Sequence, residues 1–217
     1  MQWEPITWQR LAERLADHLD ARESPEGEAG WQRVGIDGAP AADTAAAAEH
    51  LADALRSHGR PVLVVAADGF LRPASLRFEY GREDVDAYLG GWYDTAALWR
   101  EVLGPTDPGG TGRVLPDLWD PVTDRATRSP YIELPPGAVL IVHGPLLLGH
   151  WFPFDLSVHI RLSAGALARR TEESARWTLP AFARYEAETD PASIADALVQ
   201  ADDPRHPAWT GIRGQAG

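Results

Sequence analysis

The stretch from residue 33 to 57 reads RVGIDGAPAADTAAAAEHLADALRS and decides which fold the chain can adopt. Its first residues form a short apolar run that predicts a buried strand. The pair Asp37-Gly38 then opens a tight turn, and an Ala-rich segment with Leu51 and Leu55 one turn apart predicts a helix. A strand, a glycine turn and a helix N-terminus in this order are the layout of a phosphate-binding loop, in which backbone N–H groups face an anion.

The loop departs from the phosphate-binding consensus G-x-x-x-x-G-K-[ST]. Gly38 takes the first glycine, but Asp43 falls on the second glycine, Thr44 on the lysine and Ala45 on the metal-binding hydroxyl. A carboxylate about 4 Å from a phosphate costs on the order of 4 kcal/mol, roughly a thousandfold in affinity. Asp43 has a second interpretation, as the N-cap of the helix, which is worth about 1 kcal/mol. The sequence therefore predicts the shape of the loop without its usual chemistry.

The composition narrows the possible ligands and partners. All 20 basic residues of the 217-residue chain are arginines, so no lysine can replace the one missing from the loop. An arginine fork fits a phosphate edge differently from a lysine ammonium. A net charge of −12 argues against nucleic-acid or membrane binding, and the absence of cysteine excludes disulfides and thiolate metal sites. Because no apolar run is long enough to span a bilayer and the N-terminus lacks a leader pattern, we expect a cytoplasmic protein.

Periodicity along the rest of the chain predicts one α/β domain over residues 1–217, with its core at 31–209. Further buried strands are expected at 61–66, 138–142 and 156–162, and a hairpin around 121–124. Helices are expected at 6–21 with Thr7 as N-cap, 95–103 with Asp94 as N-cap, 164–175 and 180–187. The remaining segments are expected to be a polar linker at 22–30, a short edge strand at 195–200 and a loose tail at 210–217.

Five short segments, taken in order, carry a resemblance to a known family. They are GIDGAPAADTA at 35–45, DGF at 68–70, WDPVTDR at 119–125, RR at 169–170 and DDPRHP at 202–207. Together they resemble the uridine kinase family of P-loop nucleoside kinases, with a degenerate P-loop. The resemblance implies an α/β fold, a P-loop NTPase-like three-layer sandwich with a mostly parallel sheet, plus a small β-hairpin and a helical lid.

The resemblance also implies roles for particular side chains. Asp68 would accept the proton of the nucleoside hydroxyl as general base. The nucleoside itself would be held by a surrounding set of residues: Arg72, Tyr88, Trp92, Asp94, Trp119, Asp120 and Asp124. Lid arginines would clamp the transferring phosphoryl group: Arg169, Arg170 and Arg176. Ordinary structure explains the same residues in another way, because aspartates cap turns, aromatic rings pack and arginines on a helix form solvated faces.

Two functional hypotheses remain open. The first, which we favour, is a module that binds a nucleoside with weak or no ATP-dependent phosphotransfer. The second is an active divergent nucleoside kinase that uses ATP and Mg²⁺, with the metal held by Asp37 or Asp43. His143 stands where the family carries an acid of the magnesium shell, and it can be a neutral hydrogen-bonding residue or a metal ligand. Trp119 and Asp124 replace the family's tyrosine and histidine, which puts uridine itself in doubt. No cofactor is assigned by these residues, and none of them indicates a protein partner.

Overall fold

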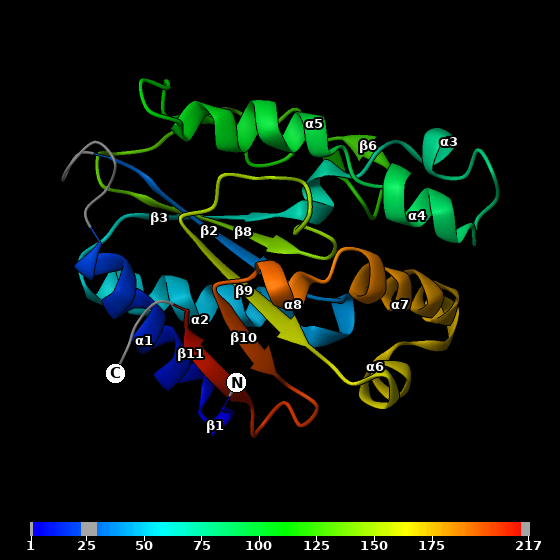
Figure 1. The fold of residues 1–217 in the computed structure, drawn as a ribbon. Helices are drawn as coiled ribbons and strands as arrows, with labels where there is room; N and C mark the ends of the chain where they lie inside the picture. The colour runs from blue at the N-terminus through cyan, green and yellow to red at the C-terminus, as the bar shows by residue number, and fades with distance from the viewer. Residues whose placement is uncertain (1, 23–29, 214–217) are drawn as a thin grey trace.

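The computed structural model describes residues 2–22 and 30–213, which form a three-layer α/β fold (Figure 1). Its sheet has seven strands in the order β1-β11-β10-β9-β2-β8-β3. Five of them, from β10 to β3, run parallel, while β11 and β1 are antiparallel additions at one edge. The strands are β1 (Glu4–Pro5), β2 (Gln32–Asp37), β3 (Val62–Ala66), β8 (Val139–Gly144), β9 (Leu156–Arg161), β10 (Ala197–Gln200) and β11 (Ala208–Ile212).

Helices cover both faces of the sheet, which explains why most residues of its central strands are buried. On one face lie α1 (Trp8–Ala21) and α2 (Thr44–Ser57), whose leucines share a buried core with β2, β8 and β9. The other face is covered by α5 (Thr95–Leu98) and the π-helical turn η4 (Trp99–Leu103). Smaller elements complete the chain: η2 (Pro40–Ala42), η3 (Ala67–Phe70), α3 (Ala74–Arg77), α4 (Val85–Gly91), η5 (Gly104–Thr106) and α8 (Pro191–Ile194).

The segment predicted as a lid lies beyond the carboxyl ends of the parallel strands (Figure 1). It consists of α6 (Ala164–Arg170), the 3₁₀ turn η6 (Glu173–Thr178) and α7 (Leu179–Glu188). A third core joins α7 to α4 and to the loop after β8. Two small antiparallel pairs lie outside the main sheet: β4 (Arg113–Val114) with β7 (Ile132–Glu133), and β5 (Trp119–Asp120) with β6 (Arg125–Ala126).

Most predicted elements are confirmed. Thr7 caps α1, because its side chain accepts a hydrogen bond from Arg10 N, and Asp94 caps α5 in the same way through Ala97 N. The hairpin around 121–124 is the β5–β6 pair. The linker predicted at 22–30 falls almost wholly outside the described residues.

Three predictions about the second half of the chain are wrong. The helix expected at 164–175 ends at Arg170, because Thr171 adopts an extended backbone and η6 begins only at Glu173. The strand expected at the sheet edge, β10, has β9 on one side and β11 on the other. The predicted tail begins inside β11, whose Trp209 and Ile212 are buried, and only residues 214–217 lie outside the described part of the chain. Gly211, at a φ of 75°, interrupts the strand pattern in the sequence and conceals β11.

Candidate functional site

The loop that the sequence analysis aligned with a phosphate-binding loop joins β2 to α2. Asp43 has a φ of 57° and a ψ of 55°, the left-handed conformation that suits the glycine of the consensus at this position. Aspartate is one of the few other residues that adopt it readily. At Gly38 a Cβ atom would lie 2.9 Å from the carbonyl oxygen of Ile160, so the first glycine is required by close packing against β9. The register of the loop predicted from the sequence therefore agrees with its backbone geometry.

The side chain of Asp43 turns back onto its own helix. Its Oδ1 accepts a hydrogen bond of 3.2 Å from Ala46 N at the first turn of α2. The N–H groups of this turn, together with the helix dipole, are what an anion would meet at a helix N-terminus. In this chain a carboxylate of the chain itself occupies part of that position.

Thr44, which stands at the lysine position, is buried and faces the end of β8. Its Oγ1 lies 3.2 Å from Nδ1 of His143. Burial lowers the pKa of His143, and the carboxylates of Asp68, Glu49 and Asp43 oppose this effect only in part. His143 is therefore a neutral imidazole at pH 7, and the Thr44–His143 contact is a hydrogen bond between two uncharged groups.

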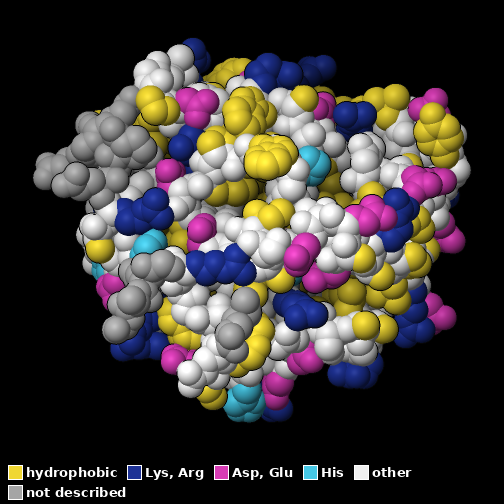
Figure 2. Space-filling view, in the orientation of Figure 1, with side chains coloured by type: hydrophobic (Ala, Val, Ile, Leu, Met, Phe, Trp, Pro, Cys, Tyr) yellow, Lys and Arg dark blue, Asp and Glu magenta, His cyan; other side chains and the backbone are white. Residues whose placement is uncertain are grey.

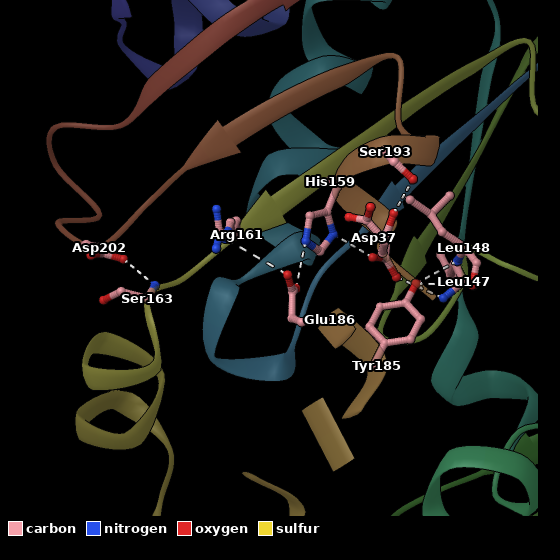
Figure 3. Close-up of polar contacts among 11 residues, drawn as sticks. Asp37, Leu147, Leu148, His159, Arg161, Ser163, Tyr185, Glu186, Ser193 and Asp202 are labelled. Carbon is pink, nitrogen blue, oxygen red and sulfur yellow. Dashed lines mark hydrogen bonds and ion pairs between the residues drawn. The ribbon is translucent and has the colours of Figure 1, made fainter. Parts of the chain in front are cut away.

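A buried chain of charges that the sequence did not predict lies on the other side of β2 (Figure 3). Asp37, with no exposed surface, accepts a 2.6 Å hydrogen bond from Nδ1 of His159, and Nε2 of His159 lies 3.0 Å from Oε1 of Glu186. Burial alone would lower the pKa of His159, but the hydrogen bonds to the two carboxylates outweigh it and raise the pKa to about 9. His159 is thus an imidazolium held between two carboxylates.

Both carboxylate oxygens of Asp37 accept hydrogen bonds from the protein. Its second oxygen, Oδ1, accepts a 2.8 Å hydrogen bond from Leu147 N, in the loop after β8. Within residues 2–22 and 30–213 there is also no group of three or more His, Asp or Glu side chains that could hold a metal ion. Asp37 is therefore a structural anchor that joins β2 to β9 and to the loop after β8.

The proposed general base, Asp68, follows β3 in η3 and is exposed to solvent. The hydroxyl of Tyr93 donates a 3.1 Å hydrogen bond to its Oδ1. Burial raises the pKa of Tyr93 well above its ordinary value, so this hydroxyl stays protonated and remains a donor. Asp68 follows β3, and His143 lies near the end of the adjacent parallel strand β8, which places both at the carboxyl edge of the sheet, where ligands bind in folds of this kind.

Aromatic side chains close this edge from the side of α4. Tyr88 and Trp92 meet edge to face at a centroid distance of 5.0 Å. Trp177 of η6 packs onto both rings, 5.5 Å from Tyr88 and 5.3 Å from Trp92. Arg72 joins this region through its backbone, which donates a hydrogen bond of 2.8 Å to the carbonyl of Trp92. The structure thus brings the predicted aromatic residues together and adds Trp177, which the sequence analysis missed.

The hairpin residues hold one another. Asp120 accepts hydrogen bonds from Val122 N at 2.9 Å and from the Thr123 hydroxyl at 2.6 Å, and the latter is the main cause that lowers its pKa. Asp124 accepts hydrogen bonds from Trp119 Nε1 at 3.0 Å and from Arg77 Nη2 at 2.9 Å. The indole hydrogen bond is the main cause of the lowered pKa of Asp124. Both carboxylates are engaged by the protein, Asp120 within the turn and Asp124 between the hairpin and α3.

The three predicted lid arginines lie on two elements, α6 and η6. Arg170 donates a 2.9 Å hydrogen bond to the carbonyl of Ala201, which ties α6 to the end of β10. Arg169 is exposed on the same helix, and Arg176 is exposed on η6.

No family model and no curated protein matches this sequence. Solved structures do match. A possible uridine kinase from Bacillus stearothermophilus superposes with a TM-score of 0.69 at 19% identity, over 86% of this chain and 96% of that one. A putative fructose transport system kinase from Silicibacter sp. TM1040 superposes with a TM-score of 0.61 at 24% identity, over 88% of this chain and 95% of that one. The chain therefore has a P-loop kinase-like fold, as predicted from the sequence.

Within the residues that the structure describes, no helix is long and apolar enough to cross a membrane.

Proposed function

We propose that this protein binds a nucleoside or a similar hydroxylated small molecule beside Asp68, and that it does not transfer phosphate from ATP. The observation that carries the proposal is the Asp43 carboxylate, which caps α2 where a phosphate would lie in an active loop. A phosphate entering this loop would have to displace Asp43 or accept a like charge next to it. At about 4 Å that repulsion costs on the order of 4 kcal/mol, which is roughly a thousandfold in affinity.

The side chains of Thr44, at the position of the catalytic lysine, and of His143, at the position of the magnesium-shell acid, are uncharged. Phosphoryl transfer depends on cations that hold the β- and γ-phosphates. The lysine position is Thr44, and its hydroxyl pairs with the neutral His143. Because the chain contains no lysine, any replacement charge would have to come from an arginine.

Asp68, at the carboxyl edge of the sheet, supports the hydroxyl-binding part of the proposal. Asp68 is exposed, and Tyr93 donates to one of its oxygens; no group in residues 2–22 and 30–213 donates to the other oxygen, which can accept a hydrogen bond from a ligand hydroxyl. Exposed Asp68 is also the observation that favours the second candidate, an active divergent nucleoside kinase, because the same oxygen can act as a general base.

Calorimetric titration with Mg²⁺-ATP and then with a panel of nucleosides tests the proposal. We expect heat from at least one nucleoside and none from ATP. Nucleoside-dependent formation of ADP would instead establish the kinase. Lack of heat from every nucleoside would remove the binding function.

A variant that restores the loop tests the reason for the loss. Asp43→Gly combined with Thr44→Lys and Ala45→Thr should confer measurable ATP binding, and Asp43→Gly alone serves as the matched control. If the triple variant folds and still does not bind ATP, the obstruction lies elsewhere, with His143 the next residue to replace.

The nucleoside pocket is tested separately at the hairpin. Asp120→Ala should abolish any rise in melting temperature that a nucleoside produces. An unchanged rise would remove Asp120 from the binding site and leave it as a turn residue.

A further inference from the structure

A cavity lies between β9, α6 and α7, on the far side of the loop from Asp68. Its volume is about 250 Å³, and Ala39 of the loop forms part of its wall. Pockets for drug-sized ligands usually measure about 300–1,000 Å³, so this one suits a smaller molecule and is too small for a nucleotide. Figure 2 shows hydrophobic side chains exposed over α6 and α7, with acidic and basic side chains around them.

One wall of the cavity is apolar. It is built from Leu162 after β9, Leu167 of α6, and Leu179 and Phe182 of α7. The three leucines remain partly exposed to solvent. Covering such surface with an apolar group gains about 25 cal/mol for each Å² removed from water.

The opposite wall carries one cation and one carboxylate with unused hydrogen-bonding capacity. Arg161 and Glu186 approach only to 3.9 Å, between Nε and Oε2, and their side chains are 48% and 37% exposed. Glu186 uses its other oxygen, Oε1, for His159. Among the described residues, neither the Arg161 guanidinium nor Oε2 of Glu186 has a hydrogen-bond partner. Figure 3 shows Glu186 lying between His159 and Arg161.

The charges around the cavity balance without a ligand. Asp37 and Glu186 supply two negative charges, and His159 and Arg161 supply two positive ones. A ligand with one net charge would disturb this balance in a partly desolvated site, whereas a zwitterion would preserve it. A zwitterion can also satisfy both unused groups, because a carboxylate pairs with the guanidinium fork and an ammonium donates to the carboxylate.

We propose that this cavity binds an apolar or aromatic α-amino acid. Its carboxylate contacts Arg161, its ammonium contacts Oε2 of Glu186, and its side chain lies against Leu162, Leu167, Leu179 and Phe182. The site is separate from the proposed nucleoside site, and the inference does not depend on that proposed function.

Calorimetric titration with L-phenylalanine and L-leucine tests the inference. Two analogues probe the two charges: 3-phenylpropionate, which lacks the ammonium, and phenethylamine, which lacks the carboxylate. We expect the amino acids to bind and each analogue to bind at least tenfold more weakly. Equal binding of either analogue would overturn the assignment of the ligand class. Absence of binding for all apolar and aromatic amino acids at millimolar concentration would overturn the site.

Variants locate the site. Arg161→Gln should weaken amino-acid binding at least tenfold. Arg56→Gln, at an exposed position of α2 that is remote from the cavity, should leave the binding unchanged. Ala183→Phe, at an exposed position of the cavity wall, should block binding by filling the space. Circular dichroism and melting curves identify any variant that fails to fold. Binding that survives both Arg161→Gln and Ala183→Phe in folded protein would place the ligand elsewhere.

Discussion

Deprotonation of His159 is expected to destabilise the protein above neutral pH. The imidazolium faces Asp37 of β2 and Glu186 of α7, and within the described residues Arg161 is the only other charged side chain that pairs with this cluster. The folded-state pKa of about 9 lies above the ordinary value of 6.5. A group with a raised pKa contributes stability that is fully present below its unfolded-state pKa and is lost as the pH rises through its folded-state pKa. The window therefore runs from about pH 6.5 to beyond pH 9.

The size of the effect follows from the same two values. The difference between 6.5 and about 9 corresponds to roughly 3 kcal/mol in the free energy of unfolding. The side chain is only 3% exposed, so solvent screening reduces this little. That is a large share of the free energy of unfolding of a typical domain, which is about 5–15 kcal/mol.

Urea denaturation between pH 7 and 10 measures the loss. The variant His159→Gln, which does not titrate, supplies the background from all other groups. His143 and His150 have lowered pKa values because of burial, so their contributions change below pH 6.5 and fall outside the window. Imidazole resonances in NMR give the pKa of His159 directly. A stability curve parallel to that of His159→Gln, or a titration midpoint at or below 6.5, would refute the reasoning.

Three further predictions concern the loop and the lid. Asp43→Ala should lose about 1–2 kcal/mol of unfolding free energy, since it removes an N-cap and places alanine in the left-handed region, which aspartate and glycine adopt more readily, whereas Asp43→Gly should lose only a few tenths; equal losses would contradict the left-handed backbone at position 43. Gly38→Ala should cost roughly 1–3 kcal/mol, because its Cβ would lie 2.9 Å from a backbone carbonyl of β9, and an unchanged melting temperature would contradict that packing. Trp177→Ala removes two aromatic contacts worth about 0.5–1.5 kcal/mol each and should speed proteolysis within η6; unchanged cleavage would mean that these rings do not hold the segment.

Local patterns in the sequence were sufficient for the layers of the fold. Strands such as β3 and β8 contain continuous apolar runs, and α1 and α2 repeat their leucines at helical spacing, so a few residues are enough to predict the type of each element. The turn chemistry at Asp43 was also readable, and the N-cap predicted there is present. The sequence did not predict β11, because Gly211 breaks its strand pattern and its pairing partner β10 is itself short.

Contacts between distant residues explain what the sequence could not predict. Asp37 and His159 are 122 positions apart, and Glu186 lies on a helix whose own pattern is an ordinary charged face. Only the parallel pairing of β2 with β9, in which Asp37 is opposite His159, brings the first two together. A histidine inside an otherwise apolar strand was the one available signal, since a buried charge requires partners.

The loop itself separates backbone geometry from chemistry. Its conformation requires a left-handed residue at position 43 and small residues where β9 approaches, and both requirements arise from packing within the protein. The cationic side chains that bind phosphate in an active loop, by contrast, contribute nothing to folding unless a nucleotide is bound. Substitutions that remove the charges but satisfy the backbone, such as an aspartate that caps α2, therefore keep the fold intact while they abolish the anion site. Under the function that we propose, the arrangement around Asp43, Thr44 and His143 is a stable alternative to a nucleotide-binding loop.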